Sequence, residues 1–160
     1  MNMLRKESPF GDTIFCEDIR FEVGGRNSLI GVMHGEIIVP LAHPGPFMLP
    51  KLCMLMTYAE RVGEGVTDPV EIRIYFPGDP DDTPSTRISV PVEPLRLVVA
   101  PAELLSDDPF SMAAVPLVMS PVVLKHEGKI KVRAVRGDTV VRLGSLTIRT
   151  VIQAPQIQSA

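Results

Sequence analysis

The sequence predicts an all-β protein, a mostly antiparallel β-sandwich of about eight or nine short strands with little helix. The strongest observation is the pattern over residues 129–150, where polar and apolar residues alternate on both sides of a tight turn. A period of two is typical of a strand with one wet face and one dry face. The second observation is that 16 of the 160 residues are prolines, spaced along the chain. This spacing favours short strands joined by turns and disfavours long helices.

Three strands are expected in the first forty residues, at 13–22, 28–33 and 36–39. The sequence Gly-Gly-Arg-Asn at 24–27 predicts a turn between the first two strands, because glycine and asparagine tolerate positive φ. His34-Gly35 predicts a bulge or bend before the third strand. Four prolines within residues 40–50 indicate that this stretch is a loop.

Residues 51–62 fit two patterns. Apolar residues fall at helical spacing (Leu52, Leu55, Ala59, Val62) and equally at strand spacing (Leu52, Met54, Met56, Tyr58). We favour a strand, because the neighbouring elements are strands and the Gly-Glu-Gly sequence at 63–65 is typical of a hairpin end.

The next elements are a clearly alternating strand at 70–76, a polar turn at 77–85, and strands at 86–92 and 95–100. A short helical turn is expected over 101–110, because Pro101 suits the first helical position and Asp107-Asp108-Pro109 would end it. Residues 112–124 are apolar, but their two prolines place them at a sheet edge or in a loop packed over the core.

The final hairpin turns at Arg136-Gly137-Asp138. Integrins bind this triplet when it lies on an exposed extracellular loop, but Gly-Asp is also good turn chemistry, and we interpret the triplet as a turn. Lys129, Lys131 and Arg133 then form the solvated face of a sheet. The hairpin resembles the last two strands of immunoglobulin-like folds, which predicts a sandwich of that type, although the chain has no tryptophan.

These elements predict one domain over residues 13–152, with an N-terminal extension at 1–12 and a C-terminal tail at 153–160. A chain of this length buries roughly two thirds of its unfolded surface, so it needs no disulfide or metal to hold a core. The net charge of −3 offers no cationic excess for the phosphates of nucleic acid. Every apolar run is far shorter than the ~20 residues that span a bilayer. Neither nucleic acid nor a membrane is therefore expected as a partner.

Two cysteines, Cys16 and Cys53, are too few for a disulfide framework. The N-terminal residues lack the apolar core of a secretory signal. We therefore expect free thiols in a reducing compartment, the cytoplasm, with each cysteine acting as a small hydrophobic residue.

The segment Phe-Cys-Glu-Asp-Ile-Arg at 15–20 is followed by Glu-Val-Gly-Gly at 22–25 and Ser-Leu-Ile-Gly-Val at 28–32. Together with Leu-Pro-Lys-Leu at 49–52 and the closing hairpin, it resembles a family of uncharacterised bacterial β-sandwich proteins. The resemblance spans most of the chain and implies a domain of unknown function. It implies no reaction, ligand or catalytic residue.

Three carboxylates crowd one expected loop: Asp79, Asp81 and Asp82. Calcium prefers about six to eight oxygen ligands, and a second acidic loop at Asp107-Asp108 would complete a site if the two loops are neighbours. Solvated acidic turns are commoner, so these residues are weak metal candidates. No cofactor and no catalytic set is expected.

Other polar residues favour structural roles. His34 and Glu36 could project from one strand face, but a zinc site needs further ligands, and His43 and His126 lie in separate loop-like segments. Asp18 shares one side of the first strand with Cys16 and Arg20, while Glu17 interrupts the apolar side. A buried carboxylate without a partner is costly, so one of these acids must meet a cation or lie at a bulge. We therefore expect Asp18 to pair with an arginine.

The leading functional hypothesis is a non-enzymatic protein-interaction or structural module that associates with itself or another protein. It is motivated by a mean hydropathy of +0.20 and by methionines in or near proline-rich segments, namely Met48, Met54, Met56, Met112 and Met119. These methionines could equally fill the core. The alternative function is calcium or small-ligand binding at the loop of residues 79–82, and an enzyme is a third possibility.

Overall fold

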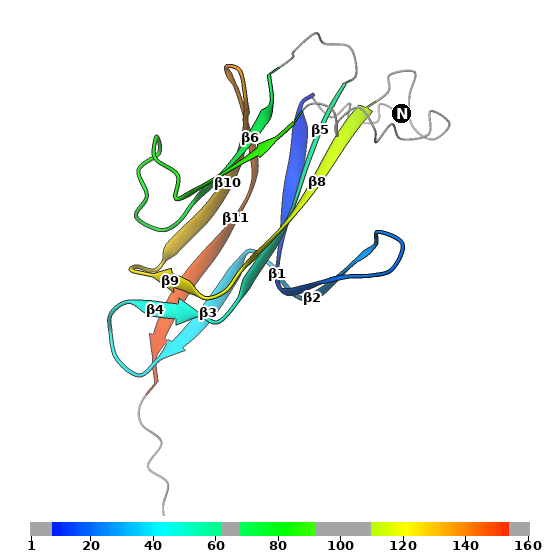
Figure 1. Cartoon of the computed structure of the whole chain (residues 1–160). Coiled ribbons are helices and arrows are strands. Elements are labelled where there is room, and N and C mark those ends of the chain that lie inside the picture. The colour runs from blue at the N-terminus through cyan, green and yellow to red at the C-terminus, as the bar shows by residue number, and fades with distance from the viewer. Residues whose placement is uncertain (1–7, 62–67, 92–109, 154–160) are drawn as a thin grey trace, which may run out of the picture.

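The computed structural model describes residues 8–61, 68–91 and 110–153, and within these ranges it contains strands and no helix (Figure 1). The predicted all-β class is therefore confirmed. Eleven strands are described: β1 (Phe10–Phe21), β2 (Asn27–Met33), β3 (Glu36–Leu41), β4 (Phe47–Leu49), β5 (Leu52–Arg61), β6 (Val70–Tyr75), β7 (Thr86–Val90), β8 (Phe110–Met119), β9 (Val122–Leu124), β10 (Gly128–Arg136) and β11 (Thr139–Ile152).

The strands form two main sheets. Sheet A has the order β2-β1-β5-β8, and every pair in it is antiparallel. Sheet B has the order β3-β11-β10-β6-β7, in which β3 runs parallel to β11 and the other pairs are antiparallel. The short strands β4 and β9 form a separate antiparallel pair.

Sheets A and B form two layers (Figure 1), and buried side chains from both form one hydrophobic core. The alternation in β10 explains how: Ile130, Val132 and Ala134 are buried, while the lysines and arginine between them face outward, as the sequence predicts. The largest buried side chains come from both sheets: Leu52, Met54, Met56 and Tyr58 from sheet A, and Ile72, Ile74, Ile130, Leu146 and Ile148 from sheet B.

The segment that fitted two patterns is the strand β5, as we favoured. This strand lies between β1 and β8 and is buried on both faces over much of its length. A strand buried on both faces loses its period of two, which explains why helical spacing fitted the same residues.

Two expectations about proline-rich segments have different outcomes. The interpretation of residues 40–50 as a loop is wrong at β4, because Phe47 and Leu49 are buried in the core and the strand pairs with β9. The segment 112–124 includes most of β8, which is the outermost of the described strands of sheet A on its side. The helical turn at 101–110 and the strand at 95–100 fall on residues outside the described ranges, apart from Phe110, which begins β8.

The closing hairpin turns through two residues, Gly137 and Asp138, between the paired Arg136 and Thr139. Gly137 has φ of +54°, as a first central residue of a type II′ turn requires. The turn interpretation of this triplet is confirmed. No helix within the described ranges is long and apolar enough to cross a membrane.

Candidate functional site

The outer face of sheet B carries a row of four arginines on four adjacent strands. Arg142 of β11 lies opposite Arg133 of β10, which lies opposite Arg73 of β6, which lies opposite Arg87 of β7. Like charges directly opposite one another destabilise a sheet. The row, which we call the arginine row, is therefore a local conflict that packing alone does not explain.

Two acidic residues neutralise part of this face. Glu71 pairs with both Arg73 and Arg87, and the Arg73 guanidinium lowers the pKa of the Glu71 carboxyl. Asp81 accepts from Lys131 Nζ at 3.4 Å and from Arg133 Nη2 at 3.1 Å, and these cations hold its pKa below the usual range. Arg133 also lies over the ring of Tyr75, 4.9 Å from its centroid.

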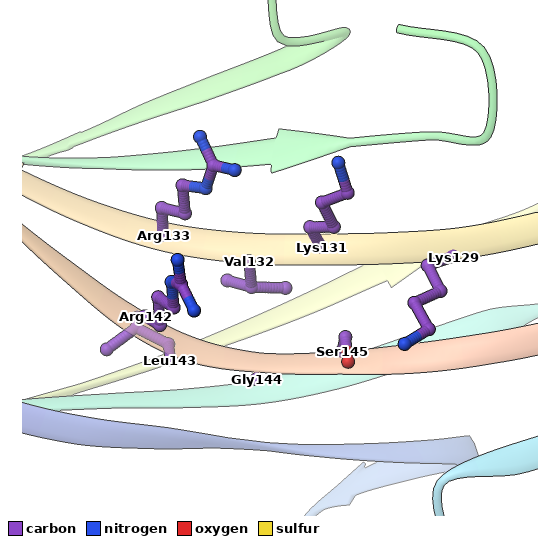
Figure 2. Close-up of a pocket in the computed structure, with 8 residues that line it drawn as sticks. All are labelled: Lys129, Lys131, Val132, Arg133, Arg142, Leu143, Gly144 and Ser145. Atoms are coloured by element: carbon purple, nitrogen blue, oxygen red, sulfur yellow. The ribbon is translucent and has the colours of Figure 1, made fainter. Parts of the chain in front are cut away.

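A hollow of about 420 Å³ opens on this face between β10 and β11 (Figure 2). The register shifts there, so that Leu143 is an extra residue in β11, a β-bulge. Arg142 and Ser145 line the hollow, while Leu143 between them is buried and Gly144 has no side chain. The bulge therefore leaves the outer face unfilled at two successive positions. Among the described residues, four cations line the hollow and no acid does: Lys129, Lys131, Arg133 and Arg142.

Two cations of the hollow lack counter-ions. Within the described ranges, Arg142 and Lys129 make no side-chain hydrogen bond or ion pair, whereas Lys131 and Arg133 share Asp81. The sequence reveals only the β10 part of this surface, whose alternating pattern predicts a solvated face. The arginines on β6, β7 and β11 occupy outward positions in their own strands, but only the pairing register brings them into one row.

The acidic loop is held by contacts within the chain. Asp79 accepts from the backbone N–H groups of Phe76 at 2.8 Å and Ser85 at 3.0 Å. Burial alone would raise the pKa of Asp79, but the hydrogen bonds from Ser85 and Phe76 outweigh it, and the pKa is lowered. Asp82 accepts from the Thr83 hydroxyl at 3.1 Å.

Calcium binding at Asp79, Asp81 and Asp82 stays a prediction. Within the described ranges, no group of three or more His, Cys, Asp and Glu residues is placed to hold a metal ion. Asp107 and Asp108, the expected completing loop, lie outside those ranges.

Arg136 belongs to a buried polar cluster rather than to an exposed motif. It is 6% exposed and pairs with Glu60, which also accepts a hydrogen bond of 3.1 Å from the Tyr58 hydroxyl. Burial, together with the nearby Glu60 carboxylate, raises the pKa of Tyr58 to about 12. A receptor that reads an exposed Arg-Gly-Asp triplet would find the arginine covered.

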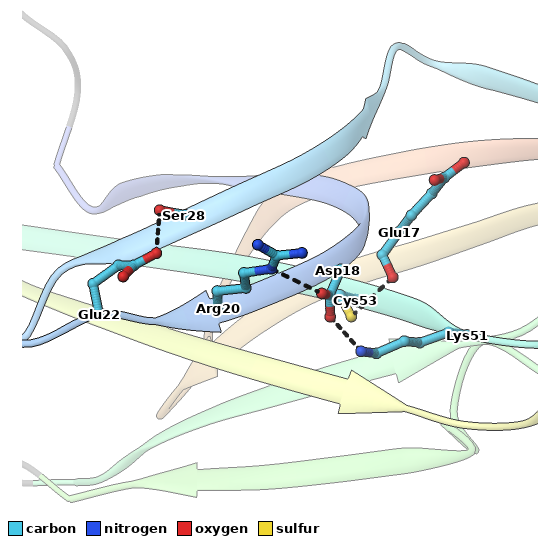
Figure 3. Close-up of polar contacts among 7 residues, drawn as sticks. All are labelled: Glu17, Asp18, Arg20, Glu22, Ser28, Lys51 and Cys53. Carbon is cyan, nitrogen blue, oxygen red and sulfur yellow. Dashed lines mark hydrogen bonds and ion pairs between the residues drawn. The ribbon is translucent and has the colours of Figure 1, made fainter.

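Figure 3 shows the polar contacts around Asp18 at one end of sheet A. Its carboxylate pairs with Lys51 and lies 3.7 Å from Arg20 Nε, so the expected arginine is present but a lysine makes the closer contact. The Lys51 hydrogen bond lowers the pKa of Asp18. The neighbouring Glu17 is exposed, and its carbonyl accepts from the Cys53 thiol at 3.6 Å.

Both cysteines are free, fully buried and directly opposite each other on β1 and β5. Burial and the neighbouring Cys53 raise the pKa of the Cys16 thiol. These observations agree with the expected role of small hydrophobic residues.

The outer face of sheet A is apolar at its centre. One row across all four strands consists of Val32, Cys16, Cys53 and Val118. The adjacent row consists of Ile14, Leu55 and Pro116. Ile14, Val32 and Val118 are 37–42% exposed. Cys16 and Cys53 between them are fully buried and pack with Ile19 and Leu29. The outer face of an antiparallel sheet normally presents polar residues, so this surface of the described strands, which we call the apolar face, is unusual.

The methionines proposed for a partner surface lie in two different environments. Met54 and Met56 are fully buried and fill the core, so they offer nothing to a partner. Met48 and Met112 are 55% and 40% exposed, and Met112 lies at the margin of the apolar face, opposite Ala59. The three histidines are exposed on separate segments, and His34 is flanked by the bend at Gly35.

No protein-family model, no curated protein and no solved structure matches the chain. The family resemblance of residues 15–20 stays a prediction.

Proposed function

We propose that this chain is a non-enzymatic interaction module that pairs with a second copy of itself through the apolar face of sheet A. The observation that carries the proposal is the uncharged centre of that face, built from two in-register rows on neighbouring strands. Its valines and isoleucine stay roughly two-fifths exposed, although they belong to strands that could have carried polar residues at no cost to the core.

A second copy suits this surface better than an unrelated ligand. The apolar face is the outside of a sheet, and sheets pack well against other sheets at a spacing of ~10 Å. Charges flank this centre: Asp12 lies near one end of β1, and Asp18, which pairs with Lys51, and Arg20 lie toward the other. A twofold axis across the strands would bring the Asp12 end of one copy beside the Arg20 end of the other.

The size of the face limits the strength of pairing. Four strands about 4.8 Å apart, each contributing some six residues at ~3.3 Å, cover roughly 400 Å² in projection. Stable dimers bury about 800 Å² on each partner. We therefore expect a weak, concentration-dependent dimer.

The test is molar mass in solution, measured by light scattering over a range from micromolar to about millimolar chain, the range of weak interfaces. The wild-type mass should rise from 17.5 kDa toward twice that value. Val118→Arg should remain monomeric, because Val118 lies in the central row. Val140→Arg is the matched control on sheet B, at a valine that is 56% exposed, and should dimerise like the wild type.

Both variants change exposed side chains, and unfolding midpoints close to the wild type will show that each is folded. A wild-type chain that stays monomeric throughout, or a Val118→Arg variant that dimerises as well as Val140→Arg, would refute the pairing surface.

We also infer that sheets A and B form an immunoglobulin-like sandwich. The strand order supports it, since β11-β10-β6-β7 matches the G-F-C-C′ order of variable-type domains and β1-β5-β8 matches A-B-E. Backbone assignments by NMR, with cross-strand contacts between β3 and β11 and between β5 and β8, would test this order.

A further inference from the structure

We propose that the hollow between β10 and β11 binds a phosphate monoester group. This site lies on sheet B and is independent of the proposed pairing through sheet A. The hollow is lined by four cations, and two of them have no counter-ion among the described residues.

The shape of the hollow comes from the backbone. The extra residue Leu143 turns its side chain into the core, and Gly144 follows with no side chain at all. A β-bulge re-aims the neighbouring side chains and is common beside functional sites. Here it separates Arg142 from Ser145, and the hollow opens between them and the cations of β10 (Figure 2).

Gly144 is favoured by its backbone conformation. Its φ of +154° lies in a region that favours glycine, and a Cβ there would lie 3.4 Å from Thr13 Cβ of β1. A Cβ at Gly144 would point toward β1 in ordinary van der Waals contact, so the gap in the outer face comes from the backbone of the bulge.

The charge of the hollow selects the ligand. Arg142 and Lys129 have no counter-ion within the described ranges, and Arg133 faces Arg142 directly. A phosphate monoester carries about −1.5 to −2 charges at neutral pH, which matches two unneutralised cations. The guanidinium groups of Arg142 and Arg133 can each present a planar pair of N–H donors to phosphate oxygens, and Ser145 can donate its hydroxyl.

The chain already places one anionic group on this rim. Asp81, 74% exposed in its side chain, accepts from Lys131 and Arg133 by reaching across from the loop between β6 and β7. This contact shows that the cations are oriented to receive oxygen ligands. It also means that Asp81 competes with an incoming phosphate for two of the four cations.

A nucleic-acid strand fits this face less well than a single phosphate group. Proteins that hold single strands stack bases on exposed aromatic rings. Tyr75 is the aromatic residue at an outward position on the described strands of sheet B, and it is 2% exposed beneath Arg133. The phosphate could belong to a small metabolite or to a phosphorylated side chain, and the experiment separates these sources.

The experiment measures binding by isothermal titration and by NMR chemical shifts of the full chain. The probes are inorganic phosphate, a phosphoserine peptide, the same peptide with serine, and a single-stranded RNA without terminal phosphate. Binding of inorganic phosphate and the phosphopeptide alike assigns the site to the phosphate group alone. A phosphopeptide that binds much tighter assigns it to a phosphorylated protein.

Arg142→Gln should weaken phosphate binding about tenfold, because it removes a charged donor from the hollow. Arg149→Gln is the matched control, since it removes the same charge from the same strand at a residue that pairs with Glu36 outside the hollow. It should bind like the wild type. Asp81→Asn should tighten binding, because it releases Lys131 and Arg133.

The proposal is overturned if the wild type binds no phosphate probe at millimolar concentration. It is also overturned if the two arginine variants lose affinity equally, which would indicate diffuse charge attraction, or if the RNA binds tighter than the phosphopeptide. All three variants alter exposed or half-exposed side chains, so unfolding midpoints serve as the folding check.

Discussion

The buried hydroxyl of Tyr58 makes the stability of this protein depend on alkaline pH. Its phenol is 2% exposed and donates to the Glu60 carboxylate. Ionising it in the folded chain would bury a negative charge beside another one, which explains a folded pKa of about 12. In the unfolded chain the pKa is about 10.

Because the folded pKa lies above the unfolded one, the stability contributed by Tyr58 is fully present below about pH 10 and is lost as the pH rises toward 12. A folded pKa about two units above the unfolded one corresponds to roughly 2–3 kcal/mol of unfolding free energy. We expect the wild type to lose this amount across that interval in addition to the losses from other groups.

The assay compares denaturant unfolding of the wild type and Tyr58→Phe from neutral to strongly alkaline pH. The phenylalanine variant cannot ionise, so its free energy of unfolding should fall by about 2–3 kcal/mol less than that of the wild type. The chain has two tyrosines, so Tyr75→Phe leaves Tyr58 as the sole absorbing phenol and its titration can be followed directly. Parallel stability curves for wild type and Tyr58→Phe, or a phenol that titrates near its usual value, would refute the reasoning.

Three further predictions concern stability. Leu146→Ala, at a fully buried core position, should lower the free energy of unfolding by about 2–5 kcal/mol in denaturant titrations, whereas Ile152→Ala at a half-exposed position should change it by less than about 0.5 kcal/mol. Gly11→Ala should lower the free energy of unfolding by about 1–3 kcal/mol or more, because the added Cβ would lie within 2.6 Å of Leu143 and closer still to the backbone oxygen of Thr57. An unfolding midpoint equal to that of the wild type would show that β1 can shift to make room. Asp18→Asn should reduce the loss of stability that accompanies acidification. The folded pKa of Asp18 is lowered, so its contribution to stability is present above the unfolded pKa and is lost as the pH falls through the folded pKa. Identical acid unfolding profiles for the variant and the wild type would show that the pair with Lys51 contributes nothing.

What the sequence could predict was local. The hairpin of β10 and β11 has one dry face, so its period of two is visible without any knowledge of its neighbours. The strand β5 is buried on both faces and shows no such period, and its type had to be judged from context. The three-residue strand β4 was missed because two prolines precede Phe47 closely and only long-range pairing with β9 makes it a strand.

The candidate site could not be predicted for a related reason. The arginine row joins residues from four strands, and its existence depends on the register of three separate pairings. A slip of one residue in any of them would turn an arginine toward the core or out of the row. The structural role of Asp79 is easier to predict, because aspartates in turns commonly accept hydrogen bonds from nearby backbone N–H groups.

The placement of β11 between β3 and β10 has a consequence for how the chain folds. Glu36 pairs with Thr147, more than a hundred residues later, so sheet B cannot close until the last strand has been synthesised. Sheet A needs only residues up to β8, and it can therefore form while β10 and β11 are still emerging from the ribosome. Such distant pairing predicts folding in the slow range of milliseconds to seconds. Until β11 arrives, the inner faces of both sheets remain open to solvent, and this interval is when a nascent chain would most need a chaperone.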